Sequence, residues 1–139
     1  NCSTGINSFS SHHSTISNND ITNITGGTGI VSAFNGEGGG VNVADVINGN
    51  TVIGGLYGMQ VSSPYLVVDI TDNTISGSSS AGILVKGGAG PGSVNIHENA
   101  ATIMGAGVGV DIADNGIALL YRNDIKTNIT VSKFNKYFL

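Results

Sequence analysis

The sequence has 139 residues, of which 10% are charged, and its 5 basic and 9 acidic side chains give a formal net charge of −4. Globular proteins carry about 25% charged residues, so solubility must depend here on the hydroxyl and amide groups of Ser, Thr and Asn. No run of Lys or Arg could neutralise a series of phosphates, which argues against nucleic acid as a partner. No apolar stretch approaches the roughly 20 residues of a membrane span.

The first segment, residues 1–14, is polar and without period, and we expect a loose lead-in or an N-terminal cap. The chain starts without Met or an apolar leader, which indicates a mature form or a fragment. Cys2 is the only cysteine, so an internal disulfide is excluded. His12 and His13 have no Cys, Asp or Glu at ligand spacing, and we expect a solvated loop rather than a metal site.

A repeated pattern begins at Thr15: an aliphatic residue, two variable positions, Asn, one variable position and a second aliphatic. Five copies occur, at Ile16/Asn19/Ile21, Ile47/Asn50/Val52, Ile70/Asn73/Ile75, Ile96/Asn99/Ala101 and Leu120/Asn123/Ile125. The asparagines are 31, 23, 26 and 24 residues apart. Self-similarity at such a period is the mark of a solenoid.

Each repeat holds three short segments in which apolar residues alternate. One ends at the aliphatic before the Asn, one contains the aliphatic after it, and the third follows a Gly. The third set is Ile30, Met59/Val61, Ile83/Val85, Val110/Ile112 and Ile129/Val131. Alternation at β-branched positions predicts strands, and the intervening Gly, Ser, Thr and Asn disfavour helix. We therefore predict an all-β parallel β-helix over residues 15–131, with about five rungs of three strands.

The repeat resembles that of the pectin-lyase-like superfamily, the right-handed parallel β-helices of polysaccharide lyases and hydrolases, phage tailspikes and surface adhesins. The resemblance is carried by Ile70-Thr-Asp-Asn73-Thr-Ile75-Ser-Gly77 followed by Gly82-Ile-Leu-Val85, and it extends over nearly the whole chain. It implies a right-handed solenoid, but that fold hosts enzymes and inert stalks alike. The superfamily's enzymes resemble one another in further motifs that this chain lacks: an Asp-Asp pair, Gly-His-Gly, Arg-x-Lys and a cluster of acids for Ca²⁺. No cofactor or metal is implied.

The five repeated asparagines should stack along one corner of the solenoid, each amide bonding the next. The predicted ladder is Asn19, Asn50, Asn73, Asn99 and Asn123. Such ladders stabilise stacked strands, and we expect these asparagines to adopt the left-handed backbone that a tight corner needs. A row of amides that binds a ligand is the alternative.

The positions before three of these asparagines hold Asp72, Glu98 and Arg122, which should form one exterior column. We expect a surface ion-pair ladder, in which Arg122 relieves the two acids, worth about 1 kcal/mol or less. The alternative is catalytic: two carboxylates about 5 Å apart match a retaining glycosidase pair, and an Arg beside them could bind a uronate. Asp69 and Asn95 form a second exterior column of ordinary polar character, and His97 is expected to be a surface bystander.

Loops rich in Gly, Pro and Asn join the third segment of one repeat to the first of the next, and they should all leave one edge. Phe34 and Tyr65 lie in two neighbouring loops, where they could form a platform for stacking sugars. Folding back over the solenoid is the alternative.

The last segment, residues 132–139, contains the apolar residues Phe134, Tyr137, Phe138 and Leu139. An open solenoid end is an edge that needs cover, so we expect a cap, a contact tail or the start of another rung. A short stack has a large proportion of end, which predicts a homo-oligomer or a filament.

The sequence thus favours an extracellular structural or adhesive module, such as a segment of a fibre, a surface filament or a tailspike-like shaft, with weak glycan affinity along the loop edge. The alternative is a polysaccharide lyase or glycoside hydrolase domain, in which Asp72, Glu98 and Arg122 would be catalytic.

Overall fold

The computed structural model describes residues 2–36, 44–102, 107–126, 128–131 and 136–138, and all of its regular structure is strand. In chain order the strands are β1 (Cys2–Phe9), β2 (Thr15–Ser17), β3 (Asp20–Ala33), β4 (Asp45–Asn48), β5 (Thr51–Gly54), β6 (Tyr57–Ser62), β7 (Val68–Thr71), β8 (Thr74–Ser76), β9 (Ala81–Lys86), β10 (Val94–His97), β11 (Ala100–Thr102), β12 (Val108–Ala113), β13 (Ile117–Tyr121), β14 (Asp124–Ile125), β15 (Ile129–Val131) and β16 (Lys136–Phe138).

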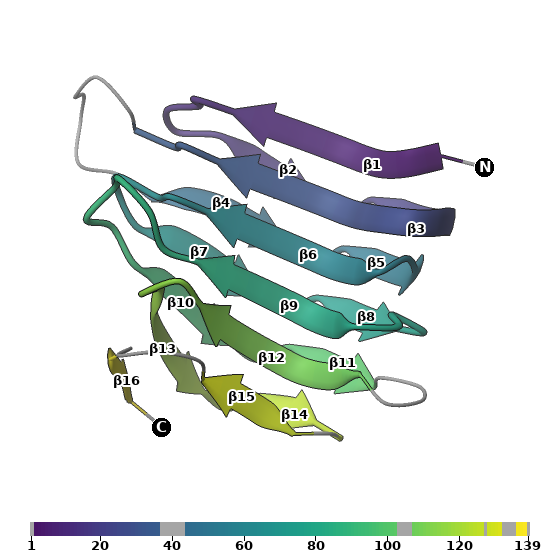
Figure 1. Ribbon diagram of the computed structural model, residues 1–139. Helices are drawn as coiled ribbons and strands as arrows, with labels where there is room; N and C mark the ends of the chain where they lie inside the picture. The colour runs from purple at the N-terminus through teal and green to yellow at the C-terminus, as the bar shows by residue number, and fades with distance from the viewer. Residues whose placement is uncertain (1, 37–43, 103–106, 127, 132–135, 139) are drawn as a thin grey trace.

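These strands stack into a parallel β-solenoid of about five turns, which confirms the predicted fold class (Figure 1). A six-stranded sheet contains the first strand of each turn, in the order β16-β13-β10-β7-β4-β2. A ten-stranded sheet contains the second strands, β14-β11-β8-β5, and the third strands, β6-β9-β12-β15, which β3 joins. In the first turn the expected second and third strands are therefore one continuous strand.

The repeats stack in the register that the sequence predicts. Along the first strands, Ile47 pairs with Ile70, Ile70 with Ile96, and Ile96 with Leu120. Along the second strands, Ile75 pairs with Ala101, and Ala101 with Ile125. Ala101 thus keeps the inner position in its turn.

The repeated aliphatic residues form the core. Ile70, Ile75 and Val85 are 0% exposed and Ile83 is 1% exposed, as predicted for the interior. The first three turns contribute inner side chains from all three of their strand positions to one continuous cluster, and the later turns add residues of β10, β12 and β13. Burial at about 25 cal/mol per Å² makes this cluster the main source of stability.

A glycine within the third strand lies where the core leaves no space for a side chain. A Cβ on Gly5 would lie 2.7 Å from Ile21 Cγ2, and one on Gly29 or Gly58 would collide with a core side chain of the second strand. The third strand can therefore pack closely over the second only because this position has no Cβ.

The first residues of the chain form β1, which pairs in parallel with β3 and places Ile6 opposite Ile30. Only Ile6 packs partly against the core, and the strand alternates between exposed and half-buried residues. The turn after β1 is fixed by Asp45, which is 2% exposed and accepts hydrogen bonds from Ser11 Oγ (2.6 Å) and Ser14 N (2.8 Å). The segment expected to be a lead-in or cap therefore extends the ten-stranded sheet by one strand.

At the other end, β16 pairs with β13, so that Ala118 lies opposite Tyr137 and Leu119 opposite Phe138. This pairing places residues 136–138 as a first strand of a further turn, one of the arrangements that the sequence left open. Phe134 and Leu139 lie outside the described residues.

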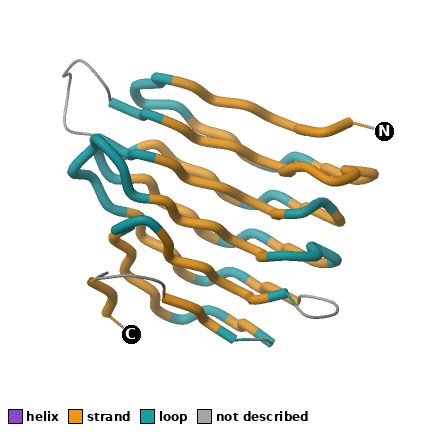
Figure 2. The backbone as a smooth tube through the Cα atoms, in the orientation of Figure 1, coloured by secondary structure: helices purple, strands orange, loops and turns teal. Residues whose placement is uncertain are grey.

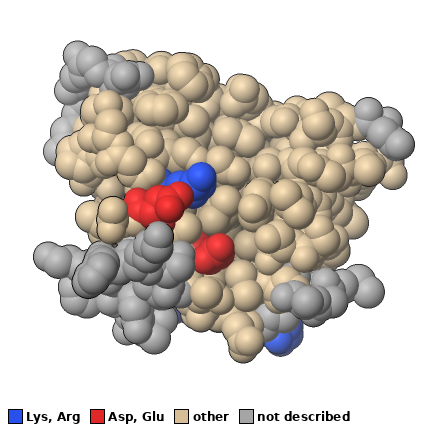
Figure 3. Space-filling model, in the orientation of Figure 1, with Lys and Arg blue, Asp and Glu red and all other residues tan. Residues whose placement is uncertain are grey.

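The loops between the third strand of one turn and the first strand of the next gather along one edge, at the left of Figure 2. The longest of these joins β3 to β4, and its residues 37–43 lie outside the described residues. The face that the third strands form is largely uncharged, with a few acidic and basic side chains near its middle and one basic patch at its lower edge (Figure 3). Lys86 and Asp114, 3.4 Å apart, pair at the loop ends of β9 and β12.

Candidate functional site

The corner between the first and second strands turns through a residue with positive φ. These residues are Asn18 (φ 56), Gly49 (φ 65), Asp72 (φ 54), Glu98 (φ 58) and Arg122 (φ 53). The expectation that the repeated asparagines would take this conformation is wrong, because none of the five has a positive φ. The preceding residue makes the turn instead, and this leaves the Asn free to point into the corner.

The asparagines form a ladder with one geometry at every step. Asn50 Nδ2 donates to Asn73 Oδ1 at 2.9 Å, and the backbone N–H of Asn50 donates to the same oxygen at 2.9 Å. The steps from Asn19 to Asn50, Asn73 to Asn99 and Asn99 to Asn123 repeat both bonds at 2.9 to 3.0 Å.

Main-chain carbonyls complete the bonding of the ladder. Asn73 Nδ2 also donates to Thr71 O and to Ile47 O, both at 2.9 Å, and Asn50, Asn73 and Asn99 are at most 2% exposed. The amides are turned toward one another and toward the backbone, which leaves no row of free amides for a ligand to bind.

Of the predicted exterior column, the structure brings two members within ion-pair distance. Arg122 Nη1 lies 3.6 Å from Glu98 Oε1, and these side chains are 77% and 42% exposed. Asp72 Oδ2 instead accepts a hydrogen bond from Thr71 Oγ1 at 3.2 Å. An exposed pair of this kind contributes about 1 kcal/mol or less.

His97 lies at the centre of the polar cluster on the outer face of the six-stranded sheet. Its side chain is only 16% exposed. Nε2 lies 3.4 Å from Asp69 Oδ1, and Nδ1 lies 3.3 Å from both Glu98 Oε2 and Thr71 Oγ1. The ring stacks on Tyr121, with centroids 4.6 Å apart and planes 4° from parallel. The histidine expected to be a bystander therefore links three successive turns.

The strand register alone brings most of the residues of this cluster together. Thr71, His97 and Tyr121 occupy the same position in consecutive first strands, and Asp69 lies two residues before Thr71. Stacked exterior positions are about 4.8 Å apart, within reach of side chains of this size. The sequence alone showed the columns but not which rotamers would connect them.

The chemistry open to this cluster is limited because side chains of the cluster itself face both nitrogens of His97. A general base needs a nitrogen within hydrogen-bond reach of the substrate, and here Nε2 faces Asp69 while Nδ1 faces Glu98 and Thr71. Asp69 Oδ1 is buried, and its contact with Nε2 is an ion-pair distance without hydrogen-bond geometry. The cluster fits a role in holding turns together better than a role in proton transfer.

On the loop edge, the aromatic partner of Phe34 is Phe9. Their ring centroids are 5.2 Å apart, with planes inclined at 51°, and Phe9 is 64% exposed. Tyr65 is joined to this region through its backbone N–H, which donates to Asn35 O at 3.0 Å. The expected pair of Phe34 and Tyr65 thus lies in adjacent turns, and Phe9, which sequence reasoning missed, contacts Phe34 because β1 places it opposite Ala33.

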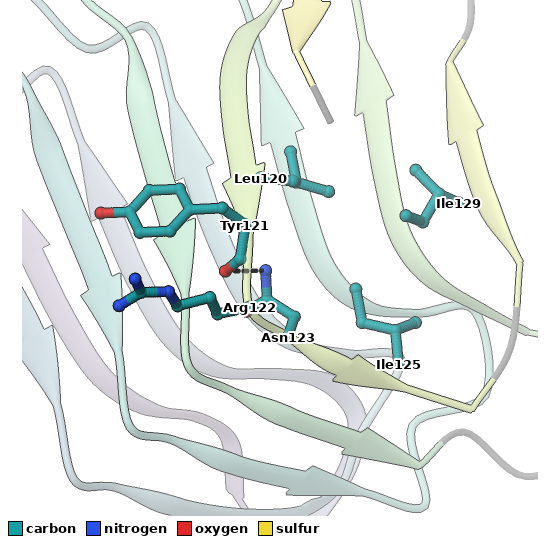
Figure 4. A pocket seen from close by; sticks show the side chains of 6 residues that line it. All are labelled: Leu120, Tyr121, Arg122, Asn123, Ile125 and Ile129. Carbon is teal, nitrogen blue, oxygen red and sulfur yellow. Dashed lines mark hydrogen bonds between the residues drawn. The ribbon is translucent and has the colours of Figure 1, made fainter.

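A cavity of about 310 Å³ lies beside the last turn. It is lined by Leu120, Tyr121, Arg122, Asn123, Ile125 and Ile129. Figure 4 shows the three aliphatic side chains on one side of the strand and Tyr121 and Arg122 on the other. The aliphatic side is the end of the core, where Ile129 is 39% exposed. This cavity is therefore the unfilled end of the solenoid, not a cleft around the polar cluster.

Among the described residues, no three His, Cys, Asp or Glu side chains are placed to hold a metal ion. In the same part of the chain, no helix is long and apolar enough to cross a membrane.

The fold places the chain in the class of parallel β-solenoids with an asparagine ladder. Comparison with protein-family models, curated proteins and solved structures found no match for the chain. What the molecule does must therefore be inferred from its own residues.

Proposed function

We propose that the chain is an extracellular structural or adhesive module, a segment of a fibre, filament or tailspike-like shaft of the pectin-lyase-like kind. The observation that carries this proposal is the bonding of its polar groups. The ladder amides bind one another, and both nitrogens of His97 are held by neighbouring side chains. Ladder amides bonded in this way stabilise the stack and are not free to bind a ligand.

Composition supports an extracellular setting. A surface rich in hydroxyls and amides, with 10% charged residues, suits a carbohydrate-rich environment. Weak glycan binding would involve the exposed Phe9 and its neighbour Phe34, since aromatic faces can stack on the apolar faces of sugars.

A second candidate, a lyase or hydrolase acting on acidic polysaccharides, is favoured by one observation. Asp69 and Glu98 lie beside His97 on one outer face, and Arg122 pairs with Glu98. An Arg beside carboxylates could bind a uronate, and the carboxylates could act as acid and base. In this reading, substrate binding would have to displace the present partners of His97.

Incubation with a panel of uronate-containing polysaccharides, with and without Ca²⁺, separates the two candidates. We expect no unsaturated product in absorbance and no new reducing ends. Turnover that Glu98→Gln abolishes, while the exposed control Asp20→Asn leaves it unchanged, would show an enzyme and end the structural proposal.

A further inference from the structure

The two ends of the solenoid are stepped in different columns of strands. At the N-terminal end β1 extends the column of third strands beyond β3, and at the C-terminal end β16 extends the column of first strands beyond β13. Among the described strands, neither β1 nor β16 has a neighbour on its outer side. Each end of the described stack therefore projects by one strand where the other end is recessed.

All the strand pairs are parallel, and this restricts how such ends can meet. An outer strand presents unpaired backbone N–H and C=O groups that need a partner. In a second copy displaced along the solenoid axis, every strand runs in the same direction as its equivalent in the first copy. Strands that meet between the two copies are therefore parallel, and each column of strands continues from one copy into the next. A copy related by a two-fold axis would reverse the strands.

We propose, on the basis of the structural role proposed above, that copies of this chain stack head to tail through these stepped ends. In this arrangement β16 of one copy pairs with β2 of the next, and β15 of the first pairs with β1 of the next. The two projecting strands then form one composite turn that lacks only its second strand.

The existing registers fix which residues meet. Val110 lies opposite Ile129 in one pair, and Ile6 lies opposite Ile30 in another, all in the inner column of the third strands. Continuing that column places Ile129 opposite Ile6 of the next copy. Ile129, 39% exposed at the end cavity, would then be covered by an aliphatic side chain.

The next residue in each strand points outward and provides a test. Thr130 and Asn7 are both exposed, and the same register places Thr130 of one copy opposite Asn7 of the next. Neighbouring parallel strands are about 4.8 Å apart, a spacing that a disulfide can bridge.

The experiment uses two single-cysteine chains, Thr130→Cys and Asn7→Cys, each also carrying Cys2→Ser. Mixed and mildly oxidised, they should give about tenfold more disulfide-linked dimer than either chain alone, because stacking holds the two thiols together. A mixture of Asn7→Cys with Gln60→Cys, also in the Cys2→Ser background, is the control for random collision. Gln60 lies in the same outward column but away from the ends.

Equal yields in all mixtures would overturn the proposal, and so would a dimer formed mainly by Thr130→Cys alone, which would show tail-to-tail association. Light scattering on the unmodified chain provides a second measurement: Asn7→Lys should lower the mean mass, whereas Gln60→Lys should not. Failure of stacking with no turnover on polysaccharides would leave the structural role in place. Turnover together with intact stacking would rule out the structural role but would leave the head-to-tail assembly supported.

Discussion

Single residues show why the asparagine recurs. The corner needs one residue in the left-handed conformation and one side chain that bonds both neighbouring turns, and the structure divides these tasks between adjacent positions. Asn73 supplies an acceptor to the turn before it and donors to the turn after it, while its Nδ2 also bonds Ile47 O. No other side chain of this size combines a donor and an acceptor in the same plane.

Replacing Asn73 should destabilise the protein far more than replacing an asparagine in a loop. Asn73→Ala leaves the N–H and Nδ2 of Asn50 without their acceptor in a buried corner, so we expect a loss of about 1 to 3 kcal/mol in the free energy of unfolding. Asn128→Ala, at an exposed position outside the ladder and without positive φ, is the control. Urea unfolding of both variants measures the difference, and equal losses would mean that the ladder contributes nothing.

At the corner position before the asparagine, glycine should be more stable than the present residue. Arg122 has φ 53, a conformation that costs a non-glycine residue about 1 to 2 kcal/mol, whereas Gly49 occupies the same position in the second turn. We expect Arg122→Gly to raise the free energy of unfolding by about 0.5 to 1 kcal/mol, since the exposed contact with Glu98 contributes less than the strain. Thermal unfolding is the measurement, and a lower melting temperature would show that the ion pair outweighs the strain.

Among the elements, the repeated strands could be predicted because each inner position must be apolar in every turn. The sequence also located the ladder, since one Asn recurs at one place. It did not reveal β1, because an outermost strand touches the core with Ile6 alone and needs no alternation of apolar residues. Nor did it reveal the contacts of His97, which depend on the rotamers of side chains from three turns.

The glycine near the start of β6 should be intolerant of even a methyl group. A Cβ on Gly58 would collide with Ile75 Cγ2 and lie 2.7 Å from Gly82 O, and the backbone atom cannot move without shifting the next turn. Gly58→Ala should therefore cost about 1 to 3 kcal/mol, the usual penalty of overpacking. Gln60→Ala, two residues further along β6 and facing outward, is the matched control in denaturant unfolding. Similar losses in both variants would mean that the strands are not packed this closely.

One carboxylate of the ten-stranded sheet should make stability depend on pH. Burial, and next the charge of Asp114, raise the pKa of Asp111, whose Oδ1 is buried without a hydrogen-bond partner. Between the usual and the raised pKa, the folded state binds more protons than the unfolded state, so this group makes stability fall as pH rises through that window. Asp111→Asn should remove that decline and be more stable at neutral pH.

The measurement for Asp111 is urea unfolding between pH 3 and pH 7, with the exposed Asp20→Asn as control, because this range is roughly where carboxylates titrate. A decline with rising pH that survives in Asp111→Asn would assign the effect to another group.

At the scale of the whole molecule, a solenoid draws its stability from contacts between neighbouring turns. The same substitution should therefore cost more free energy of unfolding in a middle turn than in an end turn. Ile75 and Ile125 occupy the same inner column, with Ala101 between them. Ile75 is 0% exposed in the middle of the stack, whereas Ile125 is half-buried beside the end cavity. Ile75→Ala should cost about 2 to 4 kcal/mol by loss of contacts and formation of a cavity.

Ile125→Ala should cost about 1 kcal/mol in dilute protein, because water already reaches its surroundings. Amide hydrogen exchange adds a second readout, with slowest exchange in β7 and β8 and fastest in β14 and β15. If copies stack head to tail, β14 gains no strand but β15 does, so raising the protein concentration should slow exchange in β15 more than in β14. Equal costs for the two substitutions at every concentration would contradict an open C-terminal end.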